Sequence, residues 1–209
     1  MDLLEQTTKG LYCRYGDFYV DPLHPVPRAV VTHAHADHVR PGSRNYFCSR
    51  AGHELVRLRT QTGAKIESAS FGERRKIGDV LVSFHPAGHI LGSSQIRIEL
   101  GGFVTVVSGD YKVENDPTSG GFEPVPCHHF FSEATFAAPV YRWPTEESVK
   151  TEILNWWHEN QRSNRTSIIY AYALGKSQRL LSLLGRDALG PIGVHGAVRQ
   201  FLGAYQRQG

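Results

Sequence analysis

The chain has 209 residues, of which 40% are hydrophobic and 21% are charged, the ordinary composition of a soluble globular protein. No apolar run approaches the roughly 18 residues that a membrane-spanning helix needs, and no secretory signal is visible in the first residues. The net charge of +3 is compatible with a nucleic-acid partner but does not require one. The cysteines are odd in number and widely spaced, which favours a reducing, cytoplasmic location: Cys13, Cys48 and Cys127.

The first half of the chain is predicted to be rich in β-strands. Two short runs on either side of a Gly-Asp turn at residues 16–17 predict a hairpin, and the β-branched run at residues 28–32 predicts a strand. A helix is predicted from Arg50 to about Thr60, with Ser49 as its cap. Glycine turns separate the remaining predicted strands, at residues 65–69, 76–88, 93–102, 103–111 and 128–134.

After Pro144 the pattern changes to an alternation of strands and helices. Residues 145–161 predict a helix with Thr145 as its N-cap and an apolar stripe made of Val149, Ile153, Leu154 and Trp157. The elements predicted next are a buried strand at 166–174, a helix at 175–185, a strand at 191–196 and a helix from 197. This alternation favours a parallel sheet, so we expect a domain boundary near residue 140.

Three histidines and an aspartate lie within residues 33–38, directly after a predicted strand. His33 and His35 are two positions apart, so in an extended segment their side chains point to the same side. Asp37 and His38 follow after the chain turns, and they suit a neighbouring ion. Neutral imidazole with carboxylate is a zinc-type ligand set. A histidine-rich surface loop is the alternative, but this spacing is rare by chance, so the motif predicts a metal site.

Two further candidate ligands also follow strands in turns of small residues. His89 lies in the segment PAGHILGSS, and Asp110 lies in VTVVSGDY. A single histidine or aspartate in a turn is more often structural than functional. Three strand-end positions of this kind in one chain favour a shared metal site, because functional residues concentrate on loops at strand ends.

The motifs THAHADH, PAGHILGS and SGDY, in this order, resemble those of the metallo-β-lactamase superfamily. The segments SEATF and YALGKSQRL resemble its β-CASP branch, whose members are nucleases that process messenger-RNA 3′ ends and repair DNA. The motifs are most similar to those of the bacterial DNA ligase-associated exonucleases, and the resemblance covers nearly the whole chain. It implies an α/β fold, with an incomplete αββα metallo-β-lactamase sandwich over residues 1–140 and the first part of an α/β β-CASP cap over 141–209.

The resemblance also implies a role for each matching residue. The ligands would hold two zinc ions, or manganese in their place: His33, His35 and His89 for the first ion, Asp37 and His38 for the second, and Asp110 for both. Asp21 would support these ligands without touching the metal. Glu133 matches an acid that orients a proton-donating histidine in relatives. In two-metal phosphodiester hydrolysis the catalytic residues would be Asp37, Asp110 and Glu133.

The sequence departs from the family pattern after Glu133. Relatives return to the lactamase fold after the cap and supply two more histidines, one for the second metal and one beside the matched acid, and nothing later in this chain resembles either. We therefore expect an N-terminal portion of a longer protein or a natural truncation, with an incomplete second zinc site. Solvent-facing or structural roles are expected for four other ligand-like side chains: Cys127, His128, His129 and His158. A substrate-side or structural role is expected for His195.

Nucleic-acid contacts are only weakly indicated. The segment GKS at 175–177 lacks the earlier glycine of a P-loop, but a helix start with Lys176 could hold a phosphate, with Arg179 near it. Four aromatic residues would suit base stacking: Trp143, Trp156, Trp157 and Tyr170. Core packing is the expected role for Trp156 or Trp157, since the two cannot both face inward.

The leading hypothesis is a zinc-dependent DNA 3′ exonuclease that works with a DNA ligase, and with a helicase, in repair. An RNA-processing nuclease with the same metal chemistry is the first alternative. Hydrolysis of a small thioester or lactam is disfavoured by the cap-like residues 133–181. From another class, the chain could bind nucleic acid or a partner without turnover.

Overall fold

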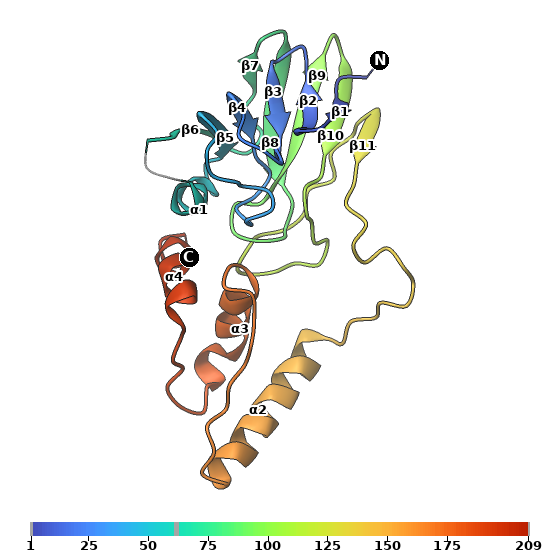
Figure 1. Cartoon of the computed structure of the whole chain (residues 1–209). Coiled ribbons are helices and arrows are strands. Elements are labelled where there is room, and N and C mark those ends of the chain that lie inside the picture. Colours follow the sequence, from blue (N-terminus) through green and yellow to red (C-terminus); the bar gives the residue numbers. More distant parts are fainter. Residues whose placement is uncertain (1, 61–62, 209) are drawn as a thin grey trace. The chain divides into compact units, whose positions relative to one another are not determined.

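The computed structural model describes residues 2–60 and 63–208 (Figure 1). The chain divides after Glu133 into two compact units, and in the described residues all strands belong to the first unit. The domain limits expected from the sequence, 1–140 and 141–209, stay a prediction. Among the described residues, no helix has the length and apolar character to cross a membrane.

The first unit contains two β-sheets, which make the described chain a mixed α/β protein. One sheet has six strands in the order β1 (Glu5–Thr7), β2 (Gly10–Cys13), β3 (Phe18–Val20), β4 (Arg28–Val30), β5 (Asn45–Ser49) and β6 (Lys65–Ala69). The other has five, in the order β11 (His129–Phe131), β10 (Phe103–Val107), β9 (Ser94–Leu100), β8 (Val80–Pro86) and β7 (Arg75–Ile77). These elements confirm the strands predicted for the first half, including the hairpin around residues 16–17.

Strand directions bring several strand ends to one edge. Strands β8 and β10 both pair antiparallel with β9, so they run in the same direction and their carboxyl ends lie at the same edge of the sheet. In the other sheet, β3 to β6 are parallel. The backbone N–H of Ser94 donates to the carbonyl of Thr32 at 2.9 Å, which ties the segment after β4 to the start of β9.

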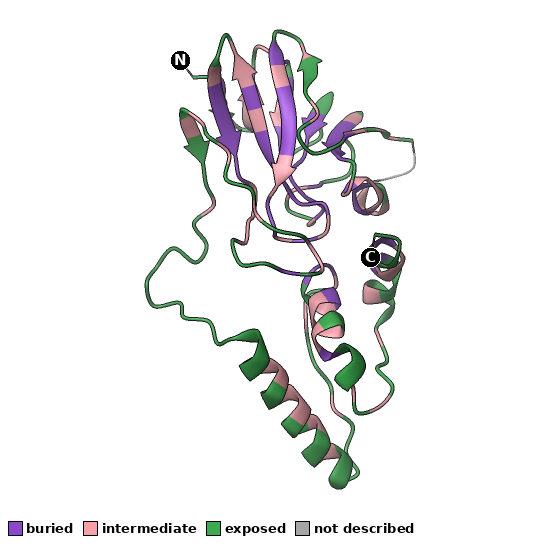
Figure 2. Ribbon diagram, turned by 180° about the vertical axis from the view of Figure 1, so that it is seen from behind, coloured by how far each residue is buried: buried purple, intermediate pink, exposed green. Residues whose placement is uncertain are grey.

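The two sheets share one hydrophobic core. Alternate side chains of β8 enter it, and the ring of Phe84 lies 4.9 Å from the ring of Phe47 on β5, measured between centroids. The central strands are accordingly the most buried part of the unit, whereas β1, β7 and β11 at the ends of the sheets are largely exposed (Figure 2). The segments that follow β4, β8 and β10 are therefore anchored to strands held rigidly by close packing.

Helix α1 (His53–Arg59) begins later than the predicted Arg50. The Ser49 hydroxyl accepts the N–H of Gly52 at 3.1 Å and donates to the carbonyl of Gly92 at 2.5 Å. These bonds hold residues 50–52 in a turn, and Gly52 becomes the N-cap. The predicted role of Ser49 as a cap is therefore wrong: it closes the turn before the helix.

The second unit contains the helices α2 (Glu146–Arg162), α3 (Lys176–Leu184) and α4 (Gly196–Gln206), with a 3-10 turn η1 (Gly185–Asp187). The Thr145 hydroxyl accepts the N–H of Ser148 at 3.2 Å, which confirms the predicted cap of α2. The predicted apolar stripe forms the less exposed face of this helix, yet no residue of α2 is fully buried (Figure 2).

The strands predicted at residues 166–174 and 191–196 do not form. Ile168 is 65% exposed and Tyr170 is 93% exposed. The β-branched, apolar composition favours a strand, but a strand needs a neighbour for its backbone groups. Among the described residues of the second unit no strand pairs with either segment, so the parallel sheet expected there is wrong.

Candidate metal site

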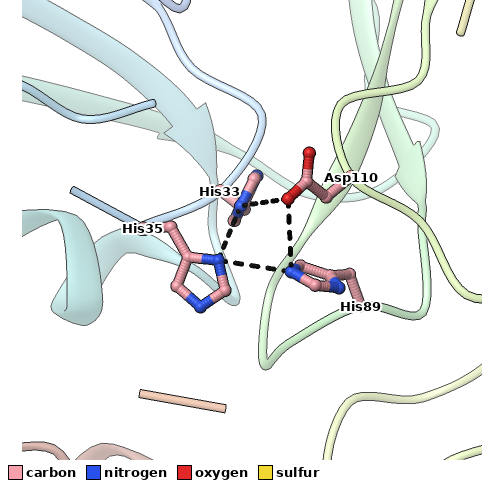
Figure 3. Close-up of side chains that lie close together, drawn as sticks. All are labelled: His33, His35, His89 and Asp110. Carbon is pink, nitrogen blue, oxygen red and sulfur yellow. Dashed lines mark hydrogen bonds and ion pairs between the residues drawn. The ribbon is translucent and has the colours of Figure 1, made fainter. Parts of the chain in front are cut away.

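Four side chains meet at the edge where β8 and β10 end (Figure 3). Two come from the segment after β4, one from the turn after β8 and one from the segment after β10. Their ligand atoms all lie within 4.8 Å of one another, and we call them the four-donor group: His33, His35, His89 and Asp110. The structure thus brings together four of the six ligands implied by the sequence.

The spacing within the four-donor group suits a shared metal ion. His35 Nδ1 lies 3.0 Å from His33 Nε2 and 3.2 Å from His89 Nε2. Asp110 Oδ2 lies 3.8 Å from His33 Nε2 and 3.6 Å from His89 Nε2. Zinc–ligand bonds of the usual length place tetrahedral donor atoms about 3.3 Å apart. Four of the six separations lie near that value and all six are within 4.8 Å, so the donor atoms present are close enough to share one ion.

The protonation states of the group also suit a cation. Burial holds the pKa of His33 well below its ordinary value, and the neighbouring histidines lower it further. Burial lowers the pKa of His89 as well. The hydrogen bond from His38 lowers the pKa of Asp110. At neutral pH these residues therefore offer neutral imidazoles and an ionised carboxylate, the forms that bind metal.

Thr32 fixes the orientation of His33. Asp21 accepts the backbone N–H of Thr32 at 2.8 Å and its hydroxyl at 2.6 Å. Because the hydroxyl proton goes to Asp21, the Thr32 oxygen accepts from His33 Nδ1–H, 3.0 Å away. His33 Nε2 then carries the lone pair that faces the group. Sequence reasoning does not single out Thr32, and its place directly before the first histidine is the one signal for it.

His38 lies beside the four-donor group. Its Nδ1 is 2.7 Å from Asp21 Oδ2, and its Nε2 is 3.3 Å from Asp110 Oδ1. Burial alone would lower the pKa of His38, but the bonds with Asp110 and Asp21 outweigh it and raise the pKa to about 10. The Asp37 side chain is 73% exposed, with its carboxylate 3.8 Å from His38 Nε2. The structure therefore does not bring Asp37 into the group.

The turn that carries His89 is held by its own serine. The Ser93 hydroxyl accepts the backbone N–H of His89 at 2.9 Å and that of Ile90 at 3.2 Å. Gly92 has a φ of +70°, and a Cβ placed there would lie 2.1 Å from the Gly52 nitrogen. Glycine at this position lets the His89 turn pack directly on the turn before α1.

Replacing Gly92 with alanine should lower the free energy of unfolding by more than the roughly 1–2 kcal/mol that a left-handed conformation costs a residue with a Cβ. Gly101→Ala is the matched control, since Gly101 has a φ of +57° and a Cβ placed there would meet nothing within 4 Å. Thermal unfolding of both variants measures the difference. An equal decrease in the free energy of unfolding for the two variants would show that the close approach of Gly92 to Gly52 does not affect stability.

The remaining predicted residues lie outside the four-donor group. The Glu133 N–H donates to Ser108 Oγ at 3.4 Å, and its charge raises the pKa of His89 against the larger effect of burial. Lys176 is exposed at the start of α3, and the Arg179 guanidinium donates to Glu146 Oε1 at 3.0 Å. Across the described residues, the four-donor group is the only set of three or more potential ligands close enough to share an ion.

By fold and site, the chain is a mixed α/β protein with a histidine–aspartate group at its strand ends that could bind a metal ion. It is 30% identical over 205 residues to "Probable DNA ligase" of Opitutus terrae, covering 96% of this chain and 20% of that protein. It is 28% identical over 202 residues to "Transcription termination factor FttA" of Methanosarcina mazei, covering 79% of this chain and 31% of that protein. It is 30% identical over 131 residues to "Endoribonuclease YSH1" of Gibberella zeae, covering 59% of this chain and 15% of that protein. These relatives confirm the resemblance to the β-CASP branch of the metallo-β-lactamase superfamily.

This chain is therefore much shorter than its relatives, spanning about a fifth of the Opitutus protein. No family model matches it. Among solved structures, "Crystal Structure of a Protein of Unknown Function from Enterococcus faecalis V583" is similar with a TM-score of 0.52 and 15% identity, over 76% of this chain and 44% of that one. That similarity concerns the fold alone.

Proposed function

We propose that the chain provides the metal site of a zinc-dependent phosphodiesterase acting on nucleic acid, a DNA 3′ exonuclease that works with a DNA ligase in repair. The proposal includes an αββα sandwich for the two-sheet unit and the start of a β-CASP cap after it. The observation that carries it is the four-donor group, whose ligand atoms lie within 4.8 Å of one another at the strand ends.

The two carboxylate oxygens of Asp110 support the proposal of two metal positions. Its Oδ2 faces the histidines of the four-donor group, while its Oδ1 lies 3.3 Å from His38 Nε2. This supports a site for two ions, with Asp110 between them and His38 and Asp37 on the second side. When bound, such ions supply Lewis-acid charge that activates water and stabilises phosphoryl oxygens.

Side chains of the protein would hold the metal, orient the proton donor and contact the nucleic acid. His33, His35 and His89 hold the first position, and Asp21 and Thr32 keep His33 Nε2 free for it. Glu133, whose charge reaches His89, is proposed to orient the group that protonates the leaving oxygen. Lys176 and Arg179 are proposed as weak contacts to the nucleic-acid backbone.

The relatives bear on the choice between DNA and RNA. The relative named a probable DNA ligase aligns with 96% of this chain, whereas the relative named an endoribonuclease aligns with 59%. The longer alignment favours DNA as substrate and a ligase as partner. RNA processing is the second candidate function, because the names of several relatives point to it. The proposed helicase partner rests on the sequence resemblance alone.

A third candidate is nucleic-acid binding without turnover. It is favoured by the exposure of Asp37 and by the engagement of both His38 nitrogens with carboxylates, which leaves the second metal position poorly prepared.

The test uses zinc-loaded and manganese-loaded chain with DNA and RNA oligonucleotides of one sequence, each labelled at the 5′ end or the 3′ end. We expect metal-dependent release of mononucleotides from DNA 3′ ends, at a low rate because both His38 nitrogens already contact carboxylates. Equal cleavage of RNA would favour the second candidate. Binding of either strand with no cleavage under any metal would favour the third.

A further inference from the structure

The loop after Asp110 contains a buried carboxylate that lies outside the four-donor group. Asp116 is only 2% exposed. A buried charge is costly unless it is paired, and Asp116 is extensively bonded. Its Oδ1 accepts the backbone N–H of Thr118 at 3.0 Å and the Thr118 hydroxyl at 2.7 Å, and its Oδ2 accepts from Lys112 Nζ at 3.1 Å. Asp116 therefore ties together residues on both sides of it in the loop.

The backbone of Asp116 closes the same loop. Its carbonyl accepts the N–H of Ser119 at 3.1 Å and that of Gly120 at 3.0 Å. Burial alone would raise the pKa of Asp116, but the bonds from Thr118 and Lys112 keep it below its usual value. The loop thus folds around an ionised carboxylate.

This loop is attached to the turn that carries His89. The Lys112 N–H donates to the carbonyl of Ala87 at 2.9 Å, and the Ser119 hydroxyl donates to the carbonyl of Gly88 at 2.9 Å. Both acceptors directly precede His89. Asp116 bonds both of these donor residues, Lys112 through its carboxylate and Ser119 through its backbone carbonyl.

The two segments are also in close contact. Gly88 has a φ of +72°, and a Cβ placed there would lie 2.4 Å from the Lys112 carbonyl oxygen. Because there is no space between the segments, a shift of the loop displaces the His89 turn or the Asp110 segment. Asp110 and His89 come from different strand ends, so their mutual position depends on this attachment.

We infer that Asp116 is a positioning residue for the metal site. It holds the loop of residues 111–121 against the turn at 86–89, so that the Asp110 carboxylate and the His89 imidazole face the same point. The inference rests on the metal-binding part of the proposed function and does not depend on the identity of the nucleic acid. Partners that hold metal ligands in place are worth about tenfold to a hundredfold in metal affinity.

The test compares Asp116→Ala with Asp116→Asn, and with Asp79→Ala as the matched control at an exposed aspartate of the same unit. Cobalt(II) is titrated into each metal-free protein, and the visible absorption bands report both affinity and ligand geometry. We expect Asp116→Ala to bind cobalt ten to a hundred times more weakly, with altered bands. Asp116→Asn should recover much of the affinity, because its amide oxygen can still accept both bonds from Thr118. Asp79→Ala should match the unsubstituted chain.

Circular dichroism at the titration temperature shows whether each variant is folded. If Asp116→Ala is unfolded, Thr118→Val, which removes one bond to Asp116, should weaken cobalt binding in the same direction by a smaller factor. A folded Asp116→Ala, or else Thr118→Val, with the affinity and bands of the unsubstituted chain would overturn the inference while leaving the metal site intact. Failure of the unsubstituted chain to bind cobalt would overturn the proposed function and this inference together.

Discussion

Replacing His35 with alanine should weaken binding of the first zinc ion by more than about a hundredfold. Loss of a residue that only hydrogen-bonds a metal ligand already lowers metal affinity by roughly tenfold to a hundredfold. His35 Nδ1 lies within 3.2 Å of two other donor nitrogens, so its removal leaves the ion with three ligands of the four-donor group. Calorimetric zinc titration measures the loss. Any hydrolysis of nucleic acid by the chain should disappear with it.

His24→Ala is the matched control, because His24 is an exposed histidine of the same unit outside the four-donor group. This variant should bind zinc as the unsubstituted chain does. Zinc affinity retained in His35→Ala would contradict the assignment of the site. Hydrolysis retained without zinc binding would indicate a contaminating nuclease in the preparation.

The chain should bind one zinc ion tightly and a second far more weakly. The proposed second position would use His38 Nε2, and the hydrogen bonds with Asp110 and Asp21 that raise the pKa of this imidazole to about 10 keep it protonated at pH 7. The second ion must therefore displace a proton that Asp21 and Asp110 stabilise. Its affinity should rise with pH, by up to about tenfold per unit between pH 7 and 9.

Mass spectrometry under native conditions, at increasing zinc concentration and at several pH values, counts the ions bound. Nuclease activity measured on the same samples should stay low until the second ion binds. Two tightly held zinc ions at pH 7 with rapid turnover would contradict the expectation of an incomplete second site.

Local patterns in the sequence were sufficient to predict the strands of the first unit and the residues of the four-donor group. His33, His35, His89 and Asp110 each follow a β-branched strand in a turn, and such turns share an edge when their strands run the same way. The shared direction of β8 and β10 follows from their antiparallel pairing with β9. The turn from β9 to β10 is visible in the sequence as the pair Gly101-Gly102, whereas the connection from β8 to β9 is the longer segment at 87–93 that carries His89. The site could therefore be anticipated before any distance was known.

Features that depend on contacts between distant segments could not be predicted in this way. The bond from Thr32 to Asp21 and the burial of Asp116 arise only after folding, and neither residue type is unusual where it stands. The segment at 166–174 was wrongly predicted to be a strand. Its composition favours a strand, but no described segment pairs with it. A strand forms only where a neighbouring segment pairs with it, so the composition of one segment does not determine whether it becomes a strand.

Anomalous X-ray scattering at the zinc absorption edge, from crystals of the zinc-loaded chain, tests the central claim most directly. We predict one strong peak bounded by His33 Nε2, His35 Nδ1, His89 Nε2 and Asp110 Oδ2. A weaker peak should appear beside His38 at higher pH. A strong zinc peak elsewhere, with none within the four-donor group, would contradict the assignment of the metal site and the nuclease function proposed from it.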